Sequence, residues 1–363
     1  MRIVYVLTSL GMGGAERQVL ALAARMAGRG HTVAIVALRP RLSQEWATAL
    51  DVIHLDMRRN PVSVFAGVMR ARRFLKGFRP DLIHSHSFHA NFVARLMGIS
   101  LRAKVLSTVH NVYEGGWHRM LAYRLTDFLS VRTTAVSGAA AERFVRLKAV
   151  PQRKCMVVTN GIDTAEFAPD QERRGRTRVA MEAGESFIWL SAGRIAPAKD
   201  IPNLLRAFAL VRAAHPAAQL WIAGEGEPMA TPENVNWLGL RRDLPALLDA
   251  ADGFVLGSAW EGMPLVIGEA MAMEIAVVAT DVGGVREMVG DEGVLVAAGD
   301  SSALADGMIG LMQRNADERE KLGQAARIRI ERGFSMEARA NQWEELYQDL
   351  IARGGSKKTS RRG

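Results

Sequence analysis

Residues 3–29 of the chain read IVYVLTSLGMGGAERQVLALAARMAGR. An almost uninterrupted apolar run leads through a glycine-rich turn at residues 11–14 into a segment whose apolar residues recur at helical spacing. Apolar runs without strict alternation suit strands that are buried on both faces of a parallel sheet. The stretch therefore predicts a strand, a tight loop and a helix, which is the first unit of an alternating α/β fold.

The same alternation continues along all 363 residues, about twice the usual length of one domain. Helical patterns such as 15–29 and 64–78 separate several of the predicted strands. The strands are predicted at 3–8, 32–37, 82–85, 104–108, 133–136 and 156–158, and then at 187–192, 219–223, 235–237, 253–256, 276–279 and 294–296. The expected fold class is α/β, with two Rossmann-like, doubly wound parallel-sheet domains. Ligands in such domains bind beyond the C-terminal ends of the strands, so two facing domains would form an interdomain cleft.

A polar stretch around Ala168-Pro-Asp170 and the charges that follow it marks the boundary between the halves, because linkers have little apolar content. The predicted divisions are an N-terminal domain at 1–165, a linker at 166–180, a C-terminal domain at 181–335, a helix at 336–352 that could pack back on the N-terminal domain, and a basic tail at 353–363.

Composition excludes several classes of protein. Hydrophobic residues make up 48% and charged residues 23%, which is typical of globular rather than disordered chains. The one cysteine, Cys155, excludes an intramolecular disulfide and a multi-cysteine metal cage. Residues 3–10 could mimic a short signal peptide, but glycines and charges follow directly, and no apolar stretch is long enough for a membrane span. We therefore expect a cytoplasmic protein.

The formal net charge is +9, and part of it is local. The predicted tail holds five basic residues and no acid, and the 64–78 helix adds four cations, Arg70, Arg72, Arg73 and Lys76. Both groups are either solvated or attracted to anionic lipid headgroups on the inner face of the cell membrane. No nucleic-acid motif accompanies the charge, so a nucleic-acid partner is not expected.

The most specific segment is SAWEGMPLVIGEAMA, residues 258–272. A predicted loop carries Glu261 and Gly262, Pro264 suits the first turn of a helix, and Glu269 follows about one turn later. Backbone N–H groups at a helix start can hold a phosphate or sugar hydroxyls. Because a carboxylate accepts hydrogen bonds from vicinal hydroxyls, Glu269 suits a ribose and Glu261 a hexose. The alternative is that Glu261 caps the helix and Glu269 lies on the surface.

A second segment, LSAGRIAPAKD at residues 190–200, places Arg194 and Lys199 on one loop after a predicted strand. A diphosphate leaving group needs positive charge where its own charge builds up. A fork-shaped Arg and a point-like Lys would supply that charge. Solvated loop cations are the alternative.

The glycine loop at residues 11–14 could bring backbone N–H groups close to an anion. It could also be a dinucleotide-binding turn, but Glu16 stands where that motif has its third glycine. His110 follows a predicted strand and either faces the site or is a core histidine.

Three further histidines, His84, His86 and His89, suggest a metal site only weakly, because no carboxylate or cysteine completes a ligand set. The chain has no Asp-x-Asp motif, which also argues against a metal-bound diphosphate. No metal and no cofactor are expected.

Together these segments resemble the retaining group 1 glycosyltransferases (family 4), which have the GT-B fold. The Glu-x7-Glu spacing of Glu261 and Glu269 carries the resemblance, with the Gly-Arg-x4-Lys pattern at 193–199 and the Gly-Gly-x-Glu loop at 13–16. Asp200 departs from the family, which usually has Gly there. Shorter matches extend the resemblance over most of the chain, at 135–137, 158–163, 223–226, 236–240 and 281–287.

The resemblance implies an acceptor-binding N-terminal domain and a nucleotide-sugar-binding C-terminal domain. It implies that Glu269 binds the nucleotide ribose, that Glu261 holds the donor sugar, and that Arg194 and Lys199 clamp the diphosphate. His110 would position the sugar near the reacting centre. The remaining implied donor-binding residues are Gly13, Gly14, Gly224, Leu240, Gly262, Met263 and Leu265, and the implied acceptor-side residues are Glu16 and His86.

The reaction that the resemblance implies is retaining transfer of a hexose or N-acetylhexosamine, expected from UDP, to an acceptor hydroxyl. The acceptor proton would pass to a donor phosphate oxygen, with Glu261 as the alternative nucleophile. A lipid-linked glycan of a bacterial surface polysaccharide such as lipopolysaccharide is the expected acceptor. The competing interpretations are a sugar-nucleotide epimerase of the same fold, an NAD-dependent oxidoreductase and a non-catalytic membrane-associated scaffold.

Overall fold

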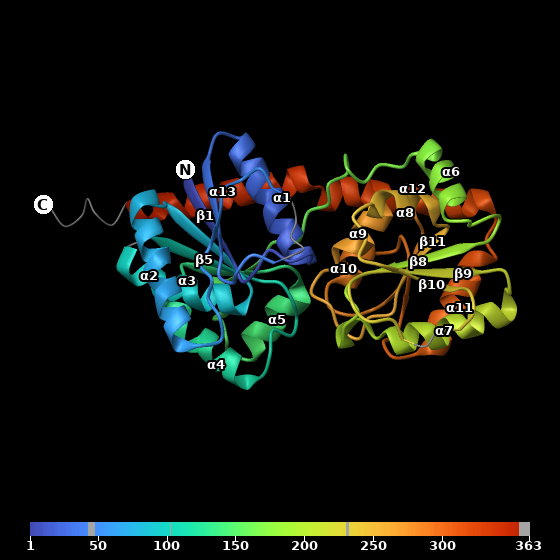
Figure 1. The fold of residues 1–363 in the computed structure, drawn as a ribbon, viewed down its shortest axis with the longest axis horizontal. Coiled ribbons are helices and arrows are strands. Elements are labelled where there is room, and N and C mark those ends of the chain that lie inside the picture. The colour runs from blue at the N-terminus through green and yellow to red at the C-terminus, as the bar shows by residue number, and fades with distance from the viewer. Residues whose placement is uncertain (43–47, 102, 230–231, 356–363) are drawn as a thin grey trace, which may run out of the picture. The chain divides into compact units, whose positions relative to one another are not determined.

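The computed structural model describes residues 1–42, 48–101, 103–229 and 232–355. It divides into two compact units, shown in Figure 1. The N-terminal unit consists of Met1–Asn160 together with the chain from Met336 onward, and the C-terminal unit consists of Gly161–Ser335. The described part ends at residue 355, so most of the predicted basic tail (353–363) lies outside it.

A seven-stranded parallel sheet forms the middle of the N-terminal unit, in the order β3-β2-β1-β4-β5-β6-β7. The strands are β1 (Arg2–Leu7), β2 (Thr32–Ala37), β3 (Val52–His54), β4 (Leu82–His86), β5 (Lys104–Val109), β6 (Arg132–Ala135) and β7 (Cys155–Val157). The strand order reverses between β1 and β4, which is the position where doubly wound sheets bind ligands.

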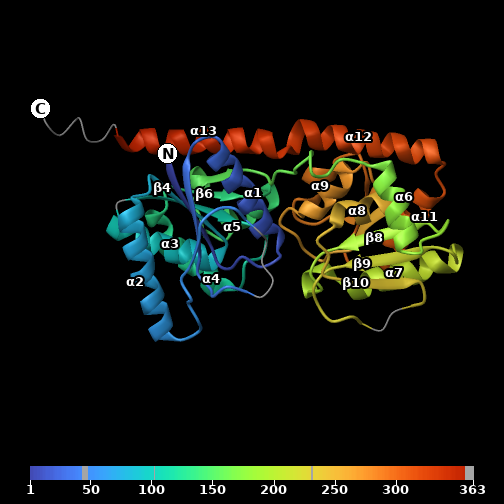
Figure 2. The ribbon, with the colours of Figure 1, turned by 45° about the horizontal axis from the view of Figure 1, so that its top comes forward.

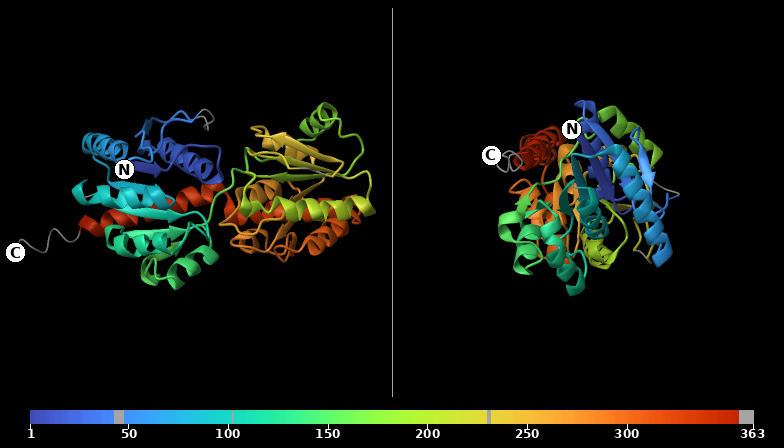
Figure 3. Two further views of the ribbon diagram at one scale, coloured as in Figure 1. Left: turned by 60° about the horizontal axis from the view of Figure 1, so that its bottom comes forward. Right: turned by 90° about the vertical axis from the view of Figure 1, so that its left-hand side faces the viewer.

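Helices cover both faces of this sheet (Figure 3). They are α1 (Gly14–Gly28), α2 (Pro61–Phe78), α3 (Phe88–Leu101), α4 (Trp117–Thr126), α5 (Gly138–Arg146) and α13 (Met336–Gly355), with short 3-10 helices η1 (Asp127–Leu129) and η2 (Gln152–Lys154). Helix α13 runs beside α1 (Figure 2), and both share a core with alternate β1 residues such as Tyr5. The intervening residues Val4 and Val6 pack with α2 and α3 on the other face, as the two-residue period of a strand requires.

The C-terminal unit holds a six-stranded parallel sheet in the order β10-β9-β8-β11-β12-β13. Its strands are β8 (Ile188–Ala192), β9 (Gln219–Ala223), β10 (Val235–Gly239), β11 (Gly253–Leu256), β12 (Val277–Thr280) and β13 (Val294–Val296). Its helices are α6 (Gln171–Ala180), η3 (Pro197–Lys199), α7 (Ile201–Ala214), α8 (Leu244–Ala250), α9 (Leu265–Ala272), α10 (Val285–Val289), α11 (Ser301–Met312) and α12 (Ala316–Phe334). The order reverses between β8 and β11. The two parallel α/β sheets confirm the predicted fold class.

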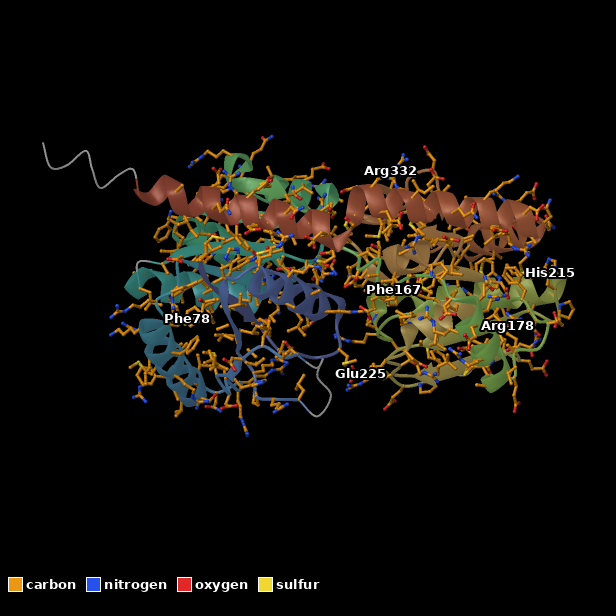
Figure 4. The ribbon with its side chains drawn as sticks, turned by 90° about the horizontal axis from the view of Figure 1, so that it is seen from above. Phe78, Phe167, Arg178, His215, Glu225 and Arg332 are labelled. Carbon is orange, nitrogen blue, oxygen red and sulfur yellow. The ribbon has the colours of Figure 1, made fainter. Side chains whose placement is uncertain are left out.

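Helix α6 differs from the linker predicted at 166–180. The Asp170 side chain accepts a hydrogen bond from the Arg173 N–H at 2.9 Å and so caps the helix. Arg173 also pairs with Asp249, and Arg178 (Figure 4) pairs with Asp252 at 3.1 Å, which fixes α6 against the end of α8. Ion pairs, rather than an apolar face, hold α6 in place. The segment therefore has few apolar residues, and from sequence it resembles a linker.

None of the described helices has the length and apolar character that a transmembrane span needs.

Candidate active site

The loop after β11 (residues 257–264) is fixed by backbone hydrogen bonds to two other loops. The Ala259 N–H donates to the Ala198 carbonyl at 2.8 Å, which ties this loop to the one after β8. The Gly284 N–H donates to the Gly262 carbonyl at 2.8 Å, which ties it to the loop after β12. Loops from three strands therefore converge at the C-terminal edge of this sheet.

Lys199 and Glu261 form an ion pair at this convergence. The Lys199 Nζ lies 2.7 Å from Glu261 Oε1, and Ser258 Oγ donates to the same oxygen at 2.7 Å. Glu261 is only 8% exposed, so the pair is largely withdrawn from water. In such surroundings electrostatic interactions are stronger than at the surface. The sequence prediction assigned no role to Ser258, because a hydroxyl three residues before a carboxylate has no characteristic pattern.

Close backbone contact explains the glycine at position 224. A Cβ added to Gly224 would lie 1.9 Å from the Gly193 carbonyl oxygen, so the loops after β8 and β9 can touch only with glycine there. The Gly224 N–H also donates to the Gly239 carbonyl at 2.8 Å, which places Leu240 beside the same loops. Arg194 follows Gly193 directly and has an exposed side chain.

Gly283 is a further residue that the sequence prediction did not assign to the site. It has a φ of +57°, and a Cβ added to it would lie 2.0 Å from the Glu261 carbonyl oxygen. Any larger residue at this position would displace the backbone that presents the Glu261 carboxylate. The two adjacent glycines in the 281–287 match were the signal in the sequence.

Asp200 adopts the left-handed conformation that glycine favours, with φ 42° and ψ 50°. Asp and Asn tolerate this region better than most residues. Its side chain also accepts a hydrogen bond from the Asn203 N–H at 3.3 Å and caps α7. Asp at this position is therefore compatible with the turn that follows Lys199.

Replacing Asp200 with alanine is expected to lower the free energy of unfolding by about 1–3 kcal/mol, through loss of the cap and left-handed strain. Asp200→Gly, the matched control, keeps the conformation without strain and is expected to lose only a few tenths of a kcal/mol. Urea denaturation of the three proteins measures the difference. Equal stability of the alanine and glycine variants would contradict this explanation.

Glu269 lies inside α9, whose first residue is Leu265 and whose N-cap is Pro264. Glu269 is 4% exposed, so the alternative of a surface carboxylate does not hold. Met263, just before the helix, is also buried. The structure thus places both Glu261 and Glu269 in the segment that follows the C-terminal end of β11.

The glycine loop and Glu16 belong to the N-terminal unit. Gly13 is the N-cap of α1, its N–H donates to the Gly11 carbonyl at 2.8 Å, and Gly14 is the first residue of the helix. Glu16 is half-buried in the first turn of α1, where a negative charge is favourable. This helix start follows β1, at the reversal of strand order.

His86 and His110 lie together at the C-terminal ends of β4 and β5. His86 Nδ1 is 3.0 Å from His110 Nε2. Burial lowers the pKa of His110 to about 4 and that of His86 well below its ordinary value, so both imidazoles are neutral near pH 7. They border a small cavity that Thr108 and Gln18 also line.

His84 is a core histidine with both ring nitrogens bonded. Its Nδ1 lies 2.7 Å from the Tyr347 hydroxyl of α13, and its Nε2 lies 2.7 Å from Thr108 Oγ1. His84 and His86 do point to the same side, with ring centroids 4.0 Å apart, whereas His89 is exposed on α3. Within the described residues no three His, Cys, Asp or Glu side chains are grouped as metal ligands would be.

Glu114 is a half-buried carboxylate beside His110 that the sequence prediction missed. Its Oε1 accepts the His110 N–H at 2.9 Å, and its Oε2 accepts the Tyr123 hydroxyl at 2.7 Å. Burial raises the pKa of Glu114 to about 7 despite these hydrogen bonds. A polar residue in a glycine-rich loop gives no sign of such burial in the sequence.

The raised pKa of Glu114 predicts a pH-dependent stability. The folded state binds this proton more tightly than the unfolded chain, so the stabilisation is complete below the unfolded pKa of 4.5 and is lost as the pH rises through about 7. Glu114→Gln should therefore gain on the order of 3 kcal/mol over the wild type between about pH 5 and about pH 8.5. Urea denaturation at both pH values tests this, with Glu142→Gln on the exposed side of α5 as control. A constant difference between Glu114→Gln and wild type would contradict it.

Family models match both units of the chain. The model described as Glycosyltransferase Family 4 matches residues 12–166, and the model described as Glycosyl transferases group 1 matches residues 186–314. The chain belongs to the group 1 glycosyltransferases of family 4. This glycosyltransferase is therefore an enzyme of the transferase class.

Relatives of this glycosyltransferase share about a quarter of its residues. The UDP-Gal:alpha-D-GlcNAc-diphosphoundecaprenol alpha-1,3-galactosyltransferase of Escherichia coli is 27% identical over 77% of this chain and 78% of its own length. The putative glycosyltransferase EpsD of Bacillus subtilis is 27% identical over 75% of this chain and 78% of its own length.

Solved structures match the fold of this glycosyltransferase over nearly its whole length. Anabaena Alr3699/HepE, solved in complex with UDP and glucose, has a TM-score of 0.83 and 19% identity, covering 96% of this chain and 99% of that chain. A glycosyltransferase from Rickettsia africae has a TM-score of 0.82 and 20% identity, covering 96% and 98%. These likenesses confirm the expected GT-B fold.

Proposed function

We propose that this glycosyltransferase moves a hexose or an N-acetylhexosamine from a UDP-sugar to an acceptor hydroxyl, with retention of configuration at the transferred carbon. The observation that supports this most is the Lys199–Glu261 ion pair where the loops after β8, β11 and β12 converge. It is a cation held beside a carboxylate at the ligand-binding edge of a doubly wound sheet. The donor named for the Escherichia coli relative and the UDP bound by Alr3699/HepE favour uridine as the base.

The proposed reaction breaks the bond between the sugar C1 and the diphosphate oxygen and forms one between C1 and the acceptor oxygen on the same face. Negative charge grows on the diphosphate as the first bond breaks, so Lys199 and Arg194 stabilise the transition state more than the ground state. The acceptor proton passes to a donor phosphate oxygen. No side chain, metal or cofactor then has to act as nucleophile or Lewis acid, and Glu261 would be the nucleophile in a two-step alternative.

The other proposed donor contacts divide between ribose, sugar and base. Glu269 binds the ribose hydroxyls, and Glu261 with Gly262 and the N–H groups of Met263 and Leu265 holds the sugar. Gly224 and Leu240 lie over the nucleotide, where the backbone of Leu240 reads uracil. We assign His110 to positioning of the sugar, Gly13 and Gly14 to the donor phosphate, and His86 and Glu16 to the acceptor side.

We propose a lipid-linked glycan as the acceptor, in the synthesis of a bacterial surface polysaccharide at the inner face of the cell membrane. The Escherichia coli relative is named for a diphosphoundecaprenol-linked acceptor, which supports this proposal. Such an acceptor would require the enzyme to work at a membrane surface.

A thermal-shift screen with UDP-, GDP- and ADP-sugars tests the proposed donor, because a ligand that binds only the folded state raises the melting temperature by mass action. We expect the largest shift with a UDP-hexose or UDP-N-acetylhexosamine, unchanged by a metal chelator. Stabilisation by NAD(P)H instead would favour an oxidoreductase. Conversion of the sugar nucleotide without any acceptor would favour an epimerase.

A further inference from the structure

Large apolar side chains are exposed mainly on one part of the N-terminal unit. Of nineteen such side chains in the described part of the chain, twelve lie between residues 61 and 131, and only four lie in the whole C-terminal unit. Concentrated apolar exposure of this kind marks a surface that binds a partner or a membrane.

Helix α4 and the adjoining η1 carry four of these side chains. Trp117 is 78% exposed, Leu121 43%, Leu125 64% and Phe128 77%. The first three recur every four residues and so lie along one face of α4, with Phe128 continuing the row from η1. We call these four residues the α4 stripe. The opposite face of α4 packs in the core through Tyr123, with Met120 beside it, so the helix has large apolar or aromatic residues on both sides.

The same part of the chain holds an excess of positive charge. Between residues 58 and 131 there are twelve Lys and Arg but only three Asp and Glu, an excess equal to the net +9 of the whole chain. Of the three acids, Asp127 is buried and paired with Lys154 at 3.0 Å, and Glu114 is half-buried. Among the cations, Arg95 is fully buried and Arg70 is paired with Asp56. Six others are exposed, namely Arg58, Arg59, Arg73, Lys76, Arg79 and Arg124. The charge that reaches solvent here is therefore mostly positive, which favours an anionic partner.

A cavity of about 380 Å³ adjoins the stripe and shares Phe128 with it. Its other lining residues include two exposed cations, Arg124 from α4 and Lys148 from the end of α5. Asp127 also lines the cavity, but it is buried and paired with Lys154, so its charge is neutralised there. The cavity thus offers two exposed cations for a phosphate.

We propose that the α4 stripe and this cavity bind an anionic phospholipid bilayer. The stripe enters the boundary between headgroups and acyl chains, where exposed Trp, Phe and Leu beside basic residues are typical of interfacial helices. The cavity takes one headgroup, with its phosphate between Arg124 and Lys148. This surface belongs to the N-terminal unit, and its lipid binding does not depend on the proposed reaction.

Co-sedimentation of the full chain with vesicles tests the proposal. We expect binding to vesicles of phosphatidylcholine mixed with phosphatidylglycerol and much weaker binding to phosphatidylcholine alone. The variant Trp117→Ser with Phe128→Ser should weaken binding at least about tenfold. The matched control, Leu210→Ser with Ile328→Ser, removes two exposed apolar side chains of the C-terminal unit and should bind as the wild type does. No binding by the wild type, or an equal loss in both variants, would overturn the proposal.

The charged part of the site has its own test. Arg124→Gln with Lys148→Gln should abolish most of the preference for phosphatidylglycerol. The control, Arg206→Gln on α7 with Arg332→Gln on α12, replaces two exposed cations and should retain it. Figure 4 labels Arg332. An unchanged preference in the first variant would contradict the headgroup site.

Two further measurements separate this proposal from its alternatives. Chains brominated near the headgroup should quench the tryptophan fluorescence of the wild type but far less that of Trp117→Phe, which should still bind vesicles. If the stripe variant instead abolished self-association of the wild type in solution, the surface would be an interface between copies and the proposal would fail. Thermal shifts with UDP-sugars should be unchanged in all these variants, so a failure here is distinct from a failure of the proposed donor.

Discussion

Replacing Lys199 with alanine is expected to lower kcat at saturating donor by about 10²–10³-fold, with a much smaller effect on the KM for the donor. The Lys199 Nζ lies 2.7 Å from Glu261 Oε1, at the edge of the sheet where the loops after β8 and β11 are joined by the hydrogen bond from Ala259 to Ala198. A cation fixed there stabilises the departing diphosphate most when its charge is greatest, so the loss should fall on kcat.

The Lys199→Ala variant also leaves the buried Glu261 carboxylate without its ion-pair partner, which itself destabilises the fold. Lys199→Arg, which keeps the charge, should recover part of the activity, and urea denaturation shows how much of any loss is structural. Lys321→Ala, at an exposed position of α12, is the matched control and should leave kcat unchanged. Wild-type kcat in Lys199→Ala at saturating donor would show that Lys199 does not assist the leaving group.

Replacing Glu269 with glutamine is expected to raise the dissociation constant for UDP by about 10- to 100-fold. This is the loss of affinity expected when hydrogen bonds to a charged group are removed. Glu269 is buried in α9, within two turns of the Pro264 cap and on the same segment as Glu261. Because the ribose is present in UDP as well as in the full donor, the loss should be measurable by calorimetry without any sugar.

The matched control for this variant is Glu320→Gln on the exposed side of α12, which should bind UDP as the wild type does. Turnover of Glu269→Gln at saturating donor should stay close to that of the wild type, since the ribose lies away from the bond that breaks. Unchanged UDP affinity, or a loss of kcat as large as that in Lys199→Ala, would contradict the ribose assignment.

The fold could be predicted from the sequence because its strands are apolar runs with clear ends. All twelve predicted strands are present to within two residues. The pattern missed β3, a strand of three residues at the edge of its sheet, where few apolar side chains are needed. It also missed α6, because arginines bonded to Asp249 and Asp252 hold that helix in place of an apolar face.

The candidate site was predictable where its residues lie close together along the chain. The spacing of Glu261 and Glu269, and of Arg194 and Lys199, is visible in single segments. Gly283 escaped prediction because it meets the Glu261 backbone only after β11 and β12 have come together. Ser258 contacts Glu261 within one loop, but a hydroxyl three residues before a carboxylate has no characteristic sequence pattern. The left-handed conformation of Asp200 could not be predicted either, because the residue type alone does not determine its backbone angles.

Calorimetric titration of UDP into the wild type and into a Lys199→Ala, Glu269→Gln double variant examines the donor site as a whole. We expect saturable binding of UDP to the wild type and no detectable binding to the double variant, with both proteins folded. Equal affinity in the two proteins, or a wild type that binds NAD(H) and not UDP, would contradict the assignment of this edge of the sheet to the nucleotide sugar.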